Sequence, residues 1–128
     1  AEARILAATD PANPYGAAIE WPDRPGDDGA RPARAAGARV ILLDGHLIGY
    51  INRTGQHLLT YLPDEEPERA KVQAALVKAL GSLASDKSPA FLRKIDQLAP
   101  GATPFAKPLE DAGFVATSRG MLHRRRGA

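Results

Sequence analysis

Apolar positions between residues 37 and 62 fall into three short runs separated by turn residues. Arg39–Leu43 is rich in branched apolar side chains and ends at Asp44-Gly45, a dipeptide typical of two-residue hairpin turns. His46–Ile51 returns as a second strand, and Gln56–Leu62 forms a third after a further turn. Because Arg39–Leu43 is apolar at consecutive positions, we expect it to be central or covered by a helix. The pattern predicts a three-stranded meander.

A helical period replaces the strand pattern after Pro67. Pro67 suits the first turn of a helix, and the acids around it would lie at the positive end of the helix dipole. Lys71 and Lys78 fall off the apolar positions and are expected to face solvent. The apolar residues recur at helical spacing and predict one buried stripe. This stripe consists of Val72, Leu76, Ala79, Leu80 and Leu83.

The remaining third of the chain predicts a strand and a short helix. Phe91–Leu98 reads as a fourth strand with imperfect alternation. Thr103-Pro104 is typical of a helix start, and Gly113 of a stop just after Ala112. Pro108 should kink this helix or delay its start, because proline lacks the amide donor.

Two closing strands, Phe114–Thr117 and Gly120–Arg124, complete the pattern. The predicted order is βββαβαββ. We therefore expect an α+β fold, with a curved antiparallel sheet or small open β-barrel and two helices.

Residues 1–36 are rich in Pro, Gly and Ala and lack sustained periodicity. We expect an extended arm around Ile5–Ala7 and a mobile linker over residues 23–36. Tyr15, Ile19 and Trp21 alternate well enough to predict an edge strand on the body. The domain division is therefore an arm and linker at 1–36 and an α+β module at 37–128.

Composition narrows the functional class. The chain has 128 residues and no cysteine, so it fits one domain without disulfides or thiolate metal sites. It has no long apolar run and no nucleotide-binding glycine motif, and because AEARILAATD lacks a basic and an apolar region we do not expect it to be a signal peptide. His46, His57 and His123 are scattered without metal-ligand spacing. We expect no membrane association, no metal and no cofactor in this chain, and a cytoplasmic location.

Among the acids, Asp96 is the least explained by local structure. Asp44 is the residue that a hairpin turn favours, and Asp111 lies just before the glycine that ends a helix. A single carboxylate can serve base-excision chemistry, so Asp96 is a candidate acid, although no partner group is visible beside it.

The clearest functional signal is the basic ending. Residues 112–128 contain no acid, although the whole chain nearly balances seventeen Lys and Arg against fifteen Asp and Glu. Clustered cations attract nucleic acid by releasing counterions from phosphates. Lys71 and Lys78 are weaker candidates for phosphate contact, and a solvated tail is the alternative interpretation. The candidate phosphate-binding residues of this ending are Arg119, Arg124, Arg125 and Arg126.

Three stretches together carry a family resemblance. They are RPARAAGARVILLDGHLIGYINRTGQHLLTYLP, FLRKIDQL and PLEDAGFVATSRGMLHR. This pattern resembles the extreme C-terminal region of bacterial Lhr-type ATP-dependent DNA helicases. The resemblance implies an ATP-hydrolysing motor and winged-helix modules upstream, and a role in DNA repair. No acid follows Asp111, so the resemblance carries over no terminal carboxylate for a glycosylase step.

The sequence thus leaves three hypotheses. The first is a non-catalytic accessory module that contacts the DNA backbone or docks on upstream domains of the same polypeptide. The second is an oligomerisation module of the same helicase. The third is a base-excision domain with Asp96 as its acid.

Overall fold

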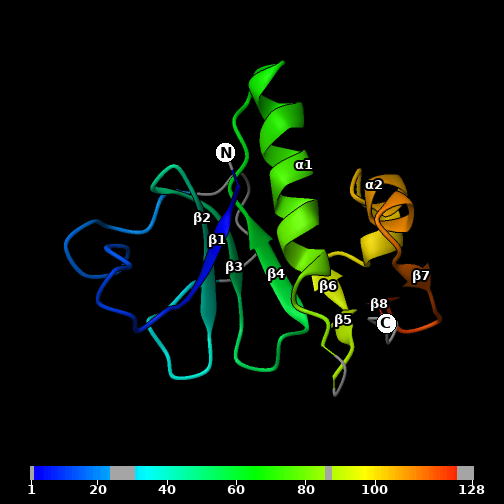
Figure 1. The fold of residues 1–128 in the computed structure, drawn as a ribbon, viewed down its shortest axis with the longest axis horizontal. Helices are drawn as coiled ribbons and strands as arrows, with labels where there is room; N and C mark the ends of the chain where they lie inside the picture. Colours follow the sequence, from blue (N-terminus) through cyan, green and yellow to red (C-terminus); the bar gives the residue numbers. More distant parts are fainter. Residues whose placement is uncertain (1, 24–30, 86–87, 124–128) are drawn as a thin grey trace.

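The computed structural model describes residues 2–23, 31–85 and 88–123. Figure 1 shows its strands, two α-helices and one 3-10 turn. The elements before residue 85 are β1 (Arg4–Ala7), β2 (Arg39–Leu43), β3 (His46–Ile51), β4 (His57–Thr60) and α1 (Glu68–Gly81). Those after it are β5 (Ala90–Leu92), β6 (Lys94–Ile95), the 3-10 turn (Pro100–Ala102), α2 (Ala106–Asp111), β7 (Val115–Ala116) and β8 (Met121–His123).

The strands form two sheets, which confirms the α+β class but not a single sheet. One sheet has the order β1-β2-β3-β4-β6 and the other the order β5-β8-β7. The meander β2-β3-β4 is antiparallel as predicted, whereas β6 pairs with β4 in parallel. In Figure 1 the small sheet lies beside the lower end of α1.

The prediction of one strand over Phe91–Leu98 is wrong. The chain changes sheets at Arg93, between β5 and β6. The amides of Arg93 and Lys94 both donate to the carbonyl of Gln56, over 2.8 and 3.2 Å. These two bonds draw the second half of the segment onto the five-stranded sheet, while β5 pairs with β8.

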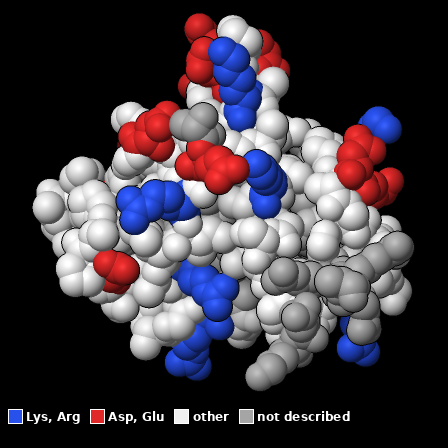
Figure 2. All heavy atoms as spheres, viewed as in Figure 1, with Lys and Arg blue, Asp and Glu red and all other residues white. Residues whose placement is uncertain are grey.

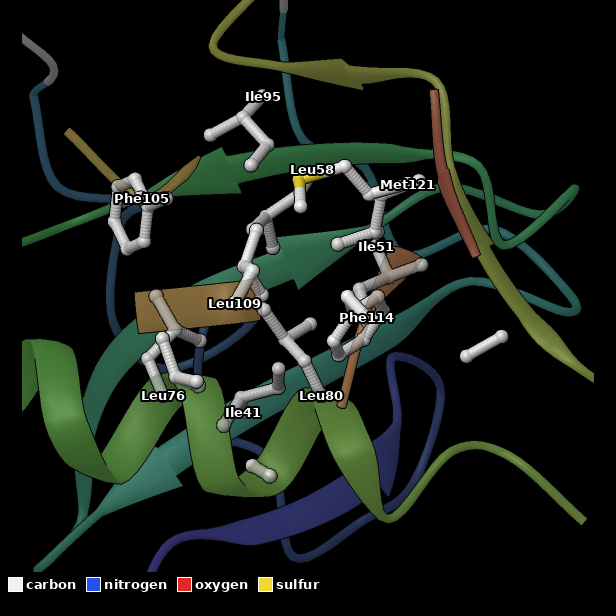
Figure 3. Packing of buried hydrophobic residues seen from close by; sticks show 14 of the residues in the cluster. Ile41, Ile51, Leu58, Leu76, Leu80, Ile95, Phe105, Leu109, Phe114 and Met121 are labelled. Carbon is white, nitrogen blue, oxygen red and sulfur yellow. The ribbon is translucent and has the colours of Figure 1, made fainter. Parts of the chain in front are cut away.

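Helix α1 covers one face of the large sheet with the predicted apolar stripe. Leu76 and Leu80 of α1 are fully buried against strand residues such as Ile41 and Leu58 (Figure 3). A Cβ at Gly49 would lie 2.9 Å from Leu76 Cδ1, so the glycine lets the helix approach the sheet closely. The buried leucines of α1 therefore define the main core.

The N-terminal segment covers the other face. Ala8 and Tyr15 pack into a second apolar cluster with strand residues, and Trp21 meets the Tyr50 ring edge-on, with ring centres 5.6 Å apart. Strand β2 is therefore covered on both faces, as its apolar run predicted. The buried strand residues of this cluster are Val40, Leu42, Leu47, Tyr50 and Leu59.

The edge strand of this segment is Arg4–Ala7, which pairs with β2. The prediction that Tyr15, Ile19 and Trp21 form an edge strand is wrong. Tyr15 and Ile19 form an isolated β-bridge with each other. The Gly16 amide donates to the Ile19 carbonyl and the Ile19 amide donates to the Pro14 carbonyl, so these hydrogen bonds stay within one tight loop. The proline-rich loop thus closes on itself instead of extending along the sheet.

The second helix begins at Ala106, later than its Thr103 signal. Pro108 therefore lies in the first turn, where a missing amide donor breaks no helical hydrogen bond. This delayed start is one of the two predicted effects of Pro108. Gly113 ends the helix with a φ of +104°, as its position predicted. Across the described residues, neither helix is long and apolar enough to cross a membrane.

Candidate nucleic-acid interface

The turn between β7 and β8 holds Arg119 at its tip. The hydroxyl of Thr117 accepts hydrogen bonds from the amides of Arg119 and Gly120, each at 3.2 Å. The same hydroxyl donates to the Gly120 carbonyl over 2.9 Å, and the Thr117 amide donates to that carbonyl over 2.8 Å. Thr117 therefore fixes the conformation of the backbone that carries Arg119.

Gly120 allows this turn to pack closely against the end of β5. A Cβ at Gly120 would collide with the carbonyl oxygen of Leu92 and would lie 3.0 Å from the Cα of Arg93. Only glycine allows this approach. Thr117 and Gly120 thus have structural roles, whereas the Arg119 side chain is exposed and has no hydrogen bond or ion pair with any other described residue.

Arg93 and Lys94 lie in the segment that this turn contacts, and Arg53 lies in the β3–β4 turn; none of the three was a candidate in the sequence. Arg93 adjoins Gly120, and Lys94 follows it. Both amides bind Gln56, which closes the β3–β4 turn where Arg53 is exposed. We call Arg53, Arg93, Lys94 and Arg119 the basic edge. The available signal was the Arg-Lys pair inside an apolar run, but the fold alone brings it beside Arg119.

Acids are scarce around the basic edge. Between residues 31 and 63 the only acid is Asp44, which lies in the β2–β3 turn at the opposite end of the sheet. Between residues 88 and 109 the only acid is Asp96. On the face drawn in Figure 2, Lys and Arg occur in both halves, whereas Asp and Glu lie mainly in the upper half, so the lower part shows cations with few acids beside them. The local charge is therefore positive although the chain is almost neutral.

Lys71 and Lys78 lie on the exposed face of α1, each beside an acid. Lys71 Nζ is 4.0 Å from Glu68, and Lys78 Nζ is 2.8 Å from Glu2. The hydrogen bond from Lys78, and then its charge, hold the pKa of Glu2 below the ordinary value of 4.5. These lysines are already partly neutralised by their partners, whereas Arg119 has no such partner in the described part of the chain.

The remaining predicted phosphate-binding residues are Arg124, Arg125 and Arg126. All three lie outside the described residues. His123, the last described residue, packs edge-on against Phe114 with ring centres 5.0 Å apart.

Asp96, the candidate acid, is engaged by Thr60. One carboxylate oxygen accepts from the Thr60 amide over 2.8 Å, and the other accepts from the Thr60 hydroxyl over 2.5 Å. The Asp96 amide donates to the Leu58 carbonyl over 2.8 Å. These contacts give the partly buried side chain a structural role that joins β4 to the turn after β6.

A groove of about 510 Å³ lies between α1, α2 and β8. Its polar lining comes from Lys78, Asp111 and His123, and the rest is apolar or glycine. The buried Nδ1 of His123 has no hydrogen-bond partner among the described residues. In the same part of the chain, no three His, Asp or Glu side chains gather in a way that could hold a metal ion.

Comparison with known proteins gives two relatives. A protein named Lhr helicase/probable uracil glycosylase, from Mycolicibacterium smegmatis, is 49% identical over 70 residues, which is 55% of this chain and 4% of that protein. A protein named Lhr helicase/uracil glycosylase, from Escherichia coli K12, is 32% identical over 116 residues, 91% of this chain and 7% of that protein. No family model matches the chain.

The chain thus spans less than a tenth of the length of either relative. The match to the Escherichia coli protein covers nearly the whole chain. The resemblance found in the sequence is confirmed, and the chain is a domain related to the Lhr-type helicases.

Proposed function

We propose that this helicase-related domain is an accessory module that contacts the DNA backbone through the basic edge. The observation that carries the proposal is the Thr117–Gly120 turn, which presents on a fixed backbone an exposed Arg119 side chain that pairs with no other described residue. The relatives are named as helicases, and helicases act on nucleic acid, which supports DNA as the polyanion.

The chemistry required of this site is phosphate recognition. An arginine guanidinium presents several donors in a planar fork that matches phosphate oxygens. A side chain on a preorganised turn loses less freedom on binding than one on a loose tail. Arg53, Arg93 and Lys94 extend the positive surface beside it, so a strand of DNA can contact several cations together. We assign no chemical step to this chain.

The test is a salt titration of DNA binding by the 128-residue chain. Each phosphate contact contributes about 0.7 to the log–log salt slope for single strands and about 0.9 for duplex DNA. Arg119→Ala should lower the slope by about one such contact, and Arg53→Ala and Arg93→Ala should act similarly. Arg4→Ala is the matched control, because Arg4 is exposed on β1, at the opposite edge of the sheet from β6.

Equal slopes for the wild-type chain, Arg119→Ala and Arg4→Ala would refute the proposal. The variants Lys71→Ala and Lys78→Ala decide whether the α1 lysines contribute. A truncation of Arg124, Arg125 and Arg126 measures the part of the slope that the chain ending supplies.

A base-excision function is the second candidate, because both relatives carry uracil glycosylase in their names. Asp96 is the acid to test first. Uracil-containing DNA incubated with the chain should yield abasic sites if the module itself excises uracil, and Asp96→Asn should abolish them. Release of uracil that persists in Asp96→Asn would assign the chemistry to other residues.

Assembly with upstream domains or with a second copy is the other functional hypothesis. Among the described strands, β1 pairs only with β2, so its other side can accept a strand from a partner. Native mass spectrometry of the chain tests the homo-oligomer directly. A monomer at all concentrations would remove that alternative.

A further inference from the structure

The turn that follows β6 has an unusual backbone. Asp96 and Gln97 are consecutive residues with φ of +51° and +69°, a region that residues other than glycine rarely occupy. Ile95 and Leu98 close the turn by exchanging two hydrogen bonds, of 2.8 and 2.9 Å. This is the two-residue hairpin geometry that Asn-Gly or Asp-Gly ordinarily forms, with Gln97 in the place of glycine.

Contacts with β4 hold this turn in place. The Asp96 amide binds the Leu58 carbonyl, and the Asp96 carboxylate takes two hydrogen bonds from Thr60. Backbone strain of this kind persists only where the surrounding structure fixes it, and it is concentrated at functional positions. The turn is therefore a rigid projection from the sheet.

The projection presents an exposed amide and an exposed apolar side chain. Gln97 is exposed, and Leu98 is 53% exposed, one of three large apolar side chains that stand out among the described residues. An isolated exposed leucine is ordinary. This one, however, lies on a fixed turn that begins directly after Arg93 and Lys94 of the basic edge.

We propose that Leu98 and Gln97 form a wedge that contacts the bases of DNA whose backbone is held at the basic edge. The substrate class is DNA with an unpaired or weakly stacked base, such as a junction between single and double strands. Apolar side chains such as leucine insert between base steps, and amides such as glutamine bind base edges. The inference rests on the proposed DNA contact and adds a base contact to it.

Position favours DNA over a protein as the partner of this turn. Arg93 and Lys94 are adjacent in the chain, and the one acid nearby, Asp96, binds Thr60. An exposed leucine close in the chain to two cations matches a surface in which apolar bases alternate with phosphates. A protein partner is the outcome to be separated by experiment.

The experiment uses the 128-residue chain and a DNA junction with 2-aminopurine at the first unpaired position. This base fluoresces more strongly when it leaves the stack. The wild-type chain should raise the fluorescence, and Leu98→Ala should remove most of that rise. Its affinity for the junction should also fall about five- to tenfold, in keeping with the loss of one base contact. Gln97→Ala should reduce both effects less.

Ile19→Ala is the matched control, since Ile19 is 48% exposed on the N-terminal loop. It should leave fluorescence and affinity unchanged. Thermal unfolding of each variant separates misfolding from loss of contact. A Leu98→Ala chain that is folded, binds the junction and unstacks the base as wild type does would overturn the wedge.

Failure of the underlying proposal has a different signature. If the wild-type chain shows no salt-dependent binding to DNA, the proposed DNA contact is refuted, and the proposed wedge is refuted with it. If the salt slope depends on Arg119 but the fluorescence does not depend on Leu98, only the wedge is refuted.

Discussion

Asp96 accepts two hydrogen bonds from Thr60, a residue 36 positions earlier in the chain. The pair connects the end of β4 with the turn after β6, two segments that α1 separates in the sequence. The threonine supplies both its amide and its hydroxyl, so the loss of Asp96 removes the acceptor of two hydrogen bonds at the buried Thr60.

Asp96→Ala should lower the free energy of unfolding by about 2–3 kcal/mol, because the amide and hydroxyl of Thr60 lose a charged acceptor. Thr60→Val should cost less, since the amide contact remains. The two changes share one interaction, so the double variant should lose less than the sum of the single losses. Urea unfolding of the four chains measures this, and simple additivity would show that the pair is not coupled.

Gln97→Gly should maintain or raise stability by up to about 1 kcal/mol, although glycine usually destabilises. A positive φ costs a side chain about 1–2 kcal/mol, which outweighs the extra entropy of glycine in the unfolded chain. Gln73→Gly, in the middle of α1, is the control and should cost about 0.5–1 kcal/mol. Thermal unfolding compares them, and equal losses would contradict a strained turn.

Gly120→Ala should destabilise the chain by about 3 kcal/mol, because the new Cβ would meet the Leu92 carbonyl and displace the β7–β8 turn. It should also weaken DNA binding through the displacement of Arg119. Gly81→Ala is the matched control. No atom lies within 4 Å of its Cβ position in α1, so it should gain about 0.4–1 kcal/mol. Unfolding curves and the salt titration provide the measurements.

Arg34→Ala should loosen the N-terminal loop. The guanidinium donates to three backbone carbonyls of this loop, those of Asp10, Asn13 and Tyr15, over 2.7–3.4 Å. Their loss should cost about 1–3 kcal/mol. The emission of Trp21, the single tryptophan, should shift to the red as the loop separates from the sheet.

Arg31→Ala controls for the loss of charge near the same loop, because Arg31 is exposed. It should leave the tryptophan emission unchanged. A red shift of equal size in both variants would show that charge, and not the three carbonyl contacts, holds the loop.

The pair of Glu2 and Lys78 predicts a pH effect. The folded-state pKa of Glu2 lies below its ordinary value of 4.5, so the pair stabilises the fold above that pH. Its contribution is lost as the pH falls through the depressed folded-state pKa. NMR titration of the Glu2 carboxyl should show Lys78→Ala returning the pKa toward 4.5, whereas Lys71→Ala should not change it. The effect on stability should be small, because both side chains are exposed.

Local signals predicted the elements that depend on neighbouring residues. The Asp44-Gly45 turn has positive φ at both positions, as the two-residue hairpin requires. The helical spacing of apolar residues in α1 predicted its buried face, and Leu76 and Leu80 of that face are fully buried. Periodicity suffices here because each feature is decided within a few residues.

Long-range pairing was not predictable. The split of Phe91–Leu98 depends on Gln56, which binds Arg93 and Lys94 from a distant turn. The order of the N-terminal loop depends on the carbonyl contacts of Arg34 and on Asn13, whose side chain binds the Ala8 carbonyl and the Tyr15 amide. Neither interaction leaves a periodic trace in the sequence.

The candidate site was predictable only in part. Arg119 was identified from charge clustering, and the structure gives the reason for its neighbours Thr117 and Gly120. Arg93 was not a candidate, because only the tertiary contact of Gly120 with Leu92 and Arg93 brings it beside the turn of Arg119. Clustering along a chain therefore finds cations that are contiguous and overlooks those that folding assembles.

The two-sided cover of the large sheet has a consequence for any shortened form of this domain. A chain that began at Gly37 would retain α1 and the small sheet but would lose β1 and the loop that covers Val40, Leu47 and Tyr50. Strand β2 would then present unpaired backbone beside a bare apolar surface, a combination that promotes intermolecular strand pairing. Such a fragment should aggregate on expression, because it lacks the N-terminal segment that pairs with β2 and covers this apolar cluster.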